Sequence, residues 1–71
     1  MDYATKMAFR AVITCLRKSN RISDEEVEEI VGAIEDAARQ ARAECRRPEH
    51  GMLKELAADL GRDCGMRQPH A

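Results

Sequence analysis

The residues of this 71-residue chain best suited to bind a metal ion are two cysteine and histidine pairs. Four residues separate Cys45 from His50, and five separate Cys64 from His70. Two thiolates and two imidazoles form the tetrahedral ligand set of structural zinc sites. However, the short Cys-to-Cys pair of a zinc finger is missing, and Cys45 falls on a predicted apolar helix face, where cysteine packs as a small hydrophobe. We therefore predict that the protein binds no metal ion and no cofactor. If zinc were bound, its ligands would be Cys45, His50, Cys64 and His70.

Few residues could support catalysis. The sequence has no glycine-rich phosphate loop, and Cys15 lies in an apolar segment with no sign of a base beside it. Ser23 is needed as a helix cap. The acidic run from Asp24 to Glu29 suits the positive end of a helix dipole. We therefore predict that the protein is not an enzyme.

Residues 52–61, Met-Leu-Lys-Glu-Leu-Ala-Ala-Asp-Leu-Gly, resemble the first helix of a helix-turn-helix DNA-binding motif. The resemblance rests on Ala57 and on Gly61 four residues later, and it implies a recognition helix after the glycine. The sequence after Gly61 contains Gly65 and Pro69 and no helical periodicity, so that helix is missing. The first turns of the preceding helix are acidic and unsuited to DNA. Base reading is therefore not predicted.

Charged residues offer candidate contacts to a partner. At 100° per residue, Lys6, Arg10 and Arg17 share one narrow strip of the first helix. Such a strip suits the acidic half of the second helix in a partner subunit, or an acidic target protein. The partner-binding candidates are the three basic residues and three acids of the second helix, namely Lys6, Arg10, Arg17, Glu28, Glu35 and Asp36.

The second helix has the clearest start signal. Ser23 and Glu26 have the spacing of a capping box, and Ile22 and Val27 flank it as a hydrophobic staple. We predict a helix over residues 24–46, with large apolar residues in its first half and alanines in its second. Pro48 is expected to end this helix.

The first helix is predicted over residues 3–18, and its apolar arc of roughly 240° is too wide for one neighbouring helix. Asn20 suits the left-handed residue of a tight turn, so the first two helices are expected to pack as antiparallel mates. A short third helix is predicted over residues 50–60, ended by Gly61, with the three helices in a domain of residues 1–61. Residues 62–71 are expected to be a flexible tail.

Composition bounds the class of protein. The net charge is −1 and only Tyr3 and Phe9 are aromatic, so the core is thin for a monomer. Three irregularly spaced cysteines and no export segment favour a soluble protein of the cytoplasm. Nine arginines against three lysines are typical of a GC-rich bacterial or phage genome.

We therefore predict an all-α homodimer in which two helical hairpins form a four-helix bundle, with the third helix as a flap. Its predicted function is protein binding, as a regulator or inhibitor of a larger partner. The alternative is a nucleic-acid-binding regulator in which the basic strips of a dimer contact phosphates.

Overall fold

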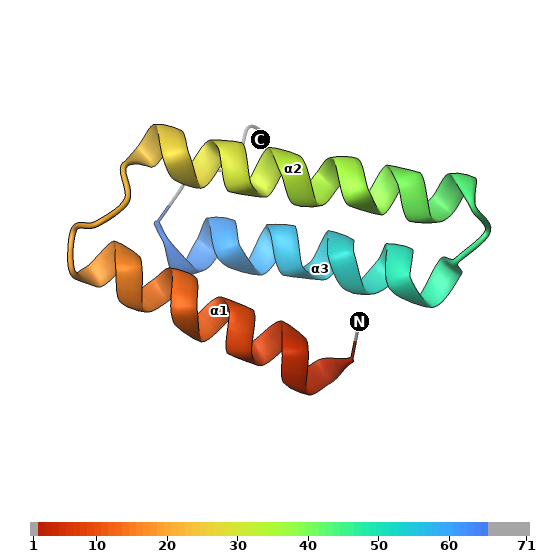
Figure 1. Ribbon diagram of the computed structural model, residues 1–71, viewed down its shortest axis with the longest axis horizontal. Coiled ribbons are helices and arrows are strands. Elements are labelled where there is room, and N and C mark those ends of the chain that lie inside the picture. Colours follow the sequence, from red (N-terminus) through yellow and green to blue (C-terminus); the bar gives the residue numbers. More distant parts are fainter. Residues whose placement is uncertain (1, 66–71) are drawn as a thin grey trace.

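Three helices make up most of the described chain. The computed structural model describes residues 2–65, which form α1 (Tyr3–Lys18), α2 (Asp24–Ala43) and α3 (Arg47–Asp63). Figure 1 shows the helices side by side, with α3 in the middle, α2 above it and α1 below it. α2 runs opposite to α3, and α1 runs in roughly the same direction as α3. The predicted all-α fold class is confirmed.

The turn between α1 and α2 follows the sequence prediction closely. Asn20 has a φ of 63°, the left-handed conformation that ends α1. The Ser23 hydroxyl accepts a hydrogen bond from the Glu26 backbone N–H at 3.1 Å, and the Glu26 carboxylate accepts one from the Ser23 N–H at 2.8 Å. Ile22 packs against the hydrophobic cluster that contains Val27. The capping box and the turn residue are therefore confirmed.

The turn between α2 and α3 corrects the prediction. α2 ends at Ala43, three residues before the expected Arg46, because Cys45 has a left-handed φ of 61°. Pro48 then lies in the first turn of α3, where its missing N–H costs no helical hydrogen bond. Pro48 therefore starts a helix, and the expectation that it ends one was wrong.

The third helix is longer than predicted. It spans Arg47–Asp63, whereas the sequence indicated residues 50–60. Gly61 is buried inside the helix and does not end it, so the turn that follows the first helix of a helix-turn-helix motif is not formed there. Cys64, directly after α3, is buried in the core, which extends the folded domain beyond residue 61. Most of the predicted tail, residues 66–71, lies outside the described residues.

The hydrophobic core lies along the seam between α2 and α3 and reaches the second half of α1. Its buried members come from all three helices and the residue after α3, and are Ile13, Val27, Leu56, Leu60 and Cys64. Leu60 has no exposed surface, and only 1% of Val27 is exposed. Three further buried residues on α2 and α3 are alanines, whose small side chains allow close approach of the helices: Ala38, Ala41 and Ala57.

The expected pairing of the first two helices was wrong. α3 packs against both α1 and α2, which make no backbone contact with each other. The alanine half of α2 therefore faces α3 and not the start of α1. His50 of α3 marks this contact, because its Nδ1 lies 2.9 Å from the Ala38 carbonyl oxygen. α3 is the central helix of the domain and not a flap, and the antiparallel hairpin is formed by α2 and α3.

The domain is thin in one direction. Its principal extents are 37, 29 and 17 Å, and a helix with its side chains is about 10–12 Å across. Three helices in one layer bury only the surfaces by which neighbouring helices touch. Both broad faces of the layer and the outer sides of the two outer helices stay exposed to solvent. Within residues 2–65, no helix combines the length and the apolar character needed to cross a membrane.

The capping box gives a direct test of the α2 boundary. Ser23→Ala should lower the free energy of unfolding by about 1 kcal/mol, because the Glu26 N–H loses its acceptor. The double variant Ser23→Ala with Glu26→Ala should cost less than the sum of the singles. Thermal and urea melts measure this, with the exposed first-turn residue in Glu25→Ala as control. If the losses of unfolding free energy in the two single variants add up to the loss in the double variant, the two hydrogen bonds of the box do not stabilise each other.

Candidate interaction surface

The side of α1 that faces α3 is charged. Only 8% of the Lys6 side chain is exposed, and its Nζ lies 2.9 Å from Glu55 Oε1 and 3.2 Å from Asp59 Oδ2. Arg10 donates two hydrogen bonds of 2.9 Å to the Asp63 carboxylate, and its Nη1 lies 3.5 Å from Asp59 Oδ2. We call these five residues the α1–α3 ion-pair cluster. Together with Ile13 they join α1 to the rest of the domain.

The cluster stabilises the charged forms of its members. The hydrogen bond from Arg10 lowers the pKa of Asp63 below the ordinary carboxyl value, and the hydrogen bond to Asp63 raises the pKa of Arg10. The hydrogen bond to Glu55, opposed by desolvation, raises the pKa of Lys6. A lysine this well covered is costly unless it is paired, so removing an acidic partner should destabilise the contact between α1 and α3.

The acidic half of this cluster was missed from the sequence. Glu55, Asp59 and Asp63 follow one another at four-residue spacing, so they lie along one strip of α3. Lys6 and Arg10 have the same spacing on α1. The matching spacing of these acidic and basic strips could have predicted the contact between α1 and α3. It was overlooked because the predicted third helix ended at residue 60 and so excluded Asp63.

The three predicted basic contact residues are all engaged within the chain. Lys6 and Arg10 belong to the ion-pair cluster. Arg17 pairs with Asp24 at the start of α2 and donates a hydrogen bond of 3.0 Å to the Ile22 carbonyl oxygen. Partner binding by these residues stays a prediction, and a partner would have to compete with the internal ion pairs.

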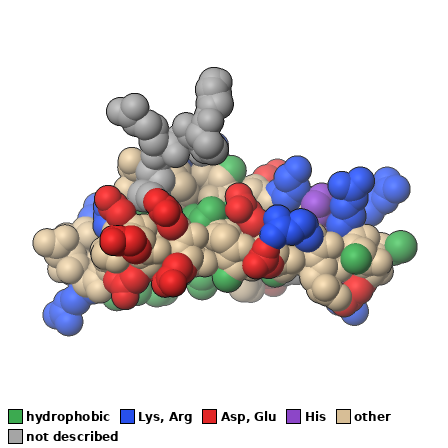
Figure 2. Space-filling view, turned by 90° about the horizontal axis from the view of Figure 1, so that it is seen from above, with side chains coloured by type: hydrophobic (Ala, Val, Ile, Leu, Met, Phe, Trp, Pro, Cys, Tyr) green, Lys and Arg blue, Asp and Glu red, His purple; other side chains and the backbone are tan. Residues whose placement is uncertain are grey.

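The predicted acidic contact residues lie on the surface of α2. Glu28, Glu35 and Asp36 are exposed, and Asp36 pairs with Arg39 one turn away. Figure 2 shows acidic side chains gathered over the half of the molecule where α2 begins, and most of the basic side chains toward the other end. The surface of α2 is therefore divided by charge along its length.

The most unusual surface of the domain is the outer face of α1, the side turned away from α3. Its centre exposes four small residues, namely Ala4, Ala8, Ala11 and Cys15. Larger apolar residues are exposed on its flanks, Tyr3 and Met7 on one side and Val12 and Phe9 on the other. Tyr3 is 68% exposed and Val12 is 56% exposed. The sequence placed Val12 on an apolar side that needs a neighbour, and the described residues 2–65 supply none. Contiguous exposed apolar patches of this kind mark interaction sites.

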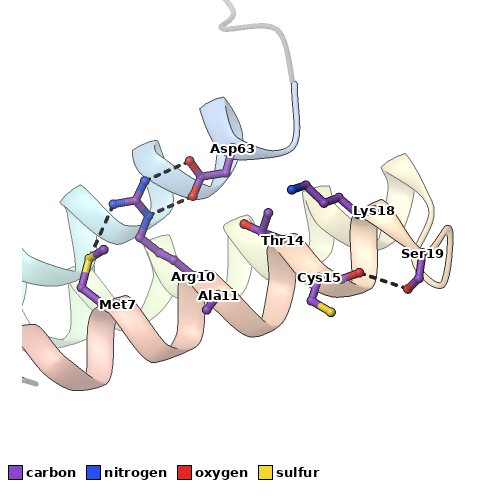
Figure 3. Close-up of a pocket in the computed structure, with 8 residues that line it drawn as sticks. All are labelled: Met7, Arg10, Ala11, Thr14, Cys15, Lys18, Ser19 and Asp63. Atoms are coloured by element: carbon purple, nitrogen blue, oxygen red, sulfur yellow. Dashed lines mark hydrogen bonds and ion pairs between the residues drawn. The ribbon is translucent and has the colours of Figure 1, made fainter.

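An open groove of about 720 Å³ lies beside this face, between α1 and the end of α3. Met7, Ala11 and Cys15 line its α1 side, and Figure 3 shows Arg10 reaching across to Asp63. The Ser19 hydroxyl donates a hydrogen bond of 3.0 Å to the Cys15 carbonyl oxygen, so it is not directed at the thiol. The groove is suited to apolar side chains of a binding partner.

The four candidate zinc ligands are not brought together. Cys45 precedes α3 and Cys64 follows it, and a 17-residue helix is about 25 Å long. His70 lies outside the described residues, and between residues 2 and 65 no three His, Cys, Asp or Glu residues are arranged to hold a metal ion. Cys64 is buried, which raises the pKa of its thiol, and it packs as a hydrophobe.

Comparison of the chain with models of known protein families, with curated proteins and with solved structures gave no match.

The ion-pair cluster predicts acid sensitivity of the α1–α3 contact. Because the folded pKa of Asp63 is lowered, its contribution to stability is present above the ordinary carboxyl pKa and is lost as pH falls through the folded pKa. Asp63→Asn should lower the melting temperature at pH 7 and reduce the fall in melting temperature below about pH 4. Thermal melts between pH 2.5 and 7 measure this.

The matched control is Asp36→Asn, which removes an exposed pair within α2. It should change the melting temperature little at either pH. An acid transition of equal size in the wild type and in Asp63→Asn would show that Asp63 does not stabilise α1 in this way.

Proposed function

We propose that this protein is a non-enzymatic interaction module that forms a homodimer through α1 and binds a larger protein as a regulator or inhibitor. The observation that carries the proposal is the exposed outer face of α1. The polar side of α1 is used against α3, so the remaining apolar side has no neighbour among residues 2–65. A second molecule would supply the neighbour that the wide apolar arc of this helix requires.

The dimer revises the expected four-helix arrangement. Its four central helices would be α1 and α3 of each copy, because α3 and not α2 packs beside α1. α2 would then lie at the outside of the assembly. Its exposed acids Glu28, Glu35 and Asp36 would be accessible to a partner whose docking surface is basic.

The nucleic-acid alternative has less support. Its phosphate contacts were to be Lys6, Arg10 and Arg17, and each of these pairs with a carboxylate of the same chain. The net charge of −1 supplies no general attraction to phosphates. A cytoplasmic location is part of the proposal, with Cys15, Cys45 and Cys64 as free thiols.

Val12→Glu tests the dimer. Val12 is 56% exposed in the single chain, so the variant should fold, and glutamate is a better helix former than valine. In the dimer it would bury an unpaired charge, and the dissociation constant should rise by about a hundredfold or more. Sedimentation velocity over a concentration series measures the dimer, and circular dichroism confirms the fold.

The matched control is Ala33→Glu, which adds the same charge at an exposed position of α2. It should leave the dimer unchanged. A wild-type chain that stays monomeric and cooperatively folded at high micromolar concentration would contradict the proposed dimer.

Partner binding is tested separately by capture from a lysate of the host. The tagged wild type should retain one protein in stoichiometric amount, and Glu28→Lys with Glu35→Lys should lose it, because both acids are exposed on α2. Ala33→Glu should retain the partner. Tight, salt-sensitive binding of duplex DNA without any captured protein would instead favour the nucleic-acid alternative.

A further inference from the structure

We infer that the outer face of α1 is occupied by the same face of a second copy, with the two α1 helices antiparallel and Ala4 of each opposite Cys15 of the other. This inference rests on the proposed homodimer and specifies its geometry. It is carried by three observations about α1: the pattern of its exposed apolar residues, the charges at its two ends, and the extent of its uncovered surface.

The exposed small residues of α1 have the spacing of a helix pair. Ala4, Ala8, Ala11 and Cys15 follow one another at intervals of four, three and four residues, as the contact positions of a coiled coil do. All four are exposed and lie on the side of α1 opposite the buried Ile13. Small side chains along a seam allow two helix axes to approach to about 8 Å.

One antiparallel register pairs the whole seam. When Ala4 faces Cys15 of the second copy, Ala8 faces Ala11. At 100° per residue, Met7 and Val12 lie on opposite flanks of this seam, each about 70° from its centre. Antiparallel helices bring like flanks together, so Met7 lies beside Ala11 and Thr14 of the second copy, and Val12 lies beside Ala8.

The charges at the ends of α1 favour the antiparallel direction. Asp2 lies at the N-terminal end, and Arg17 and Lys18 lie in the last turn. In the inferred register Asp2 of one copy approaches Lys18 of the other, while Arg17 stays paired with Asp24 of its own chain. Parallel helices would instead place Lys18 beside Lys18 and Asp2 beside Asp2. Lys18 is exposed and makes no ion pair with the rest of residues 2–65, so it is available for this contact.

The uncovered surface suits a weak, reversible dimer. A fully buried aromatic side chain contributes about 150–250 Å², so the exposed parts of Tyr3, Met7 and Val12 with the four small residues amount to roughly 400 Å² per copy. Phe9 is not counted, because it lies about 130° from the seam. Two such faces would bury on the order of 800 Å², the size of weak, transient interfaces. We therefore expect a dimer that forms at micromolar concentration.

Disulfide trapping tests the register with the native Cys15. The background is Cys45→Asn, which removes the other exposed thiol and keeps a residue type that tolerates the left-handed φ of 61°. Ala4→Cys in this background should give a covalent dimer with oxidised glutathione. The effective concentration within the dimer is millimolar, so at 10 μM chain the reaction should be about a hundredfold faster than in the control Ala33→Cys.

The background without Ala4→Cys should not cross-link rapidly. In the antiparallel register the two copies of Cys15 lie about 16 Å apart along the helix axis, well beyond the reach of a disulfide. Rapid cross-linking of Cys15 with itself would establish parallel helices and overturn the inference, while the homodimer would stand. A dimer in sedimentation whose Ala4→Cys variant cross-links no faster than Ala33→Cys would also overturn it. A monomer in sedimentation would contradict the proposed homodimer as well.

Discussion

Lys6 and Arg10 join α1 to α3 through the carboxylates of Glu55, Asp59 and Asp63, and this contact fixes which side of α1 is left uncovered. A helix with charges on one strip and apolar residues elsewhere would ordinarily bury its apolar side and expose its charges. In α1 much of the apolar side faces outward, because α3 supplies acids at the matching spacing. The unpaired apolar surface, and with it the proposed dimer, follows from this ion-pair cluster.

The position of α3 is the second constraint. The seam between α2 and α3 holds most of the core, with large residues such as Val27 and Leu60 in one half and alanines in the other. Because α3 occupies the middle, the backbone of α1 approaches that of α3 and not that of α2, and the domain stays one layer thick. A small domain of this shape buries a limited fraction of its apolar surface, so association is a physically economical way to bury more.

Local signals in the sequence predicted local structure well. The capping box at Ser23, the left-handed Asn20 and the span of α1 were all correct, because each depends on a few neighbouring residues. The order of the helices in space was not predicted, because it depends on contacts between distant residues. The predictions from Pro48 and Gly61 were wrong for a related reason, because both residue types commonly end helices. Here Pro48 lies at the start of α3, and Gly61 is buried within it.

The candidate surface was predicted in part. The width of the apolar arc of α1 correctly indicated that one neighbour would leave part of it uncovered, as the exposed Val12 shows. The basic strip was visible, but its acidic counterpart on α3 was not considered, so the strip was assigned to a partner. Distinguishing an internal ion pair from an external contact requires knowing that α1 and α3 are adjacent, which spacing within one helix cannot establish.

Nuclear magnetic resonance spectra recorded over a dilution series test the central claim that the outer face of α1 is the surface by which the chain associates. Between about 1 mM and 10 μM, the amide signals of Ala4, Ala8, Ala11 and Val12 should shift together, because a micromolar dimer dissociates in this range. Signals from Glu28 and Glu35 on α2 should stay in place, since α2 lies outside the proposed interface. Spectra independent of concentration for a single folded chain, or shifts confined to α2, would contradict the account.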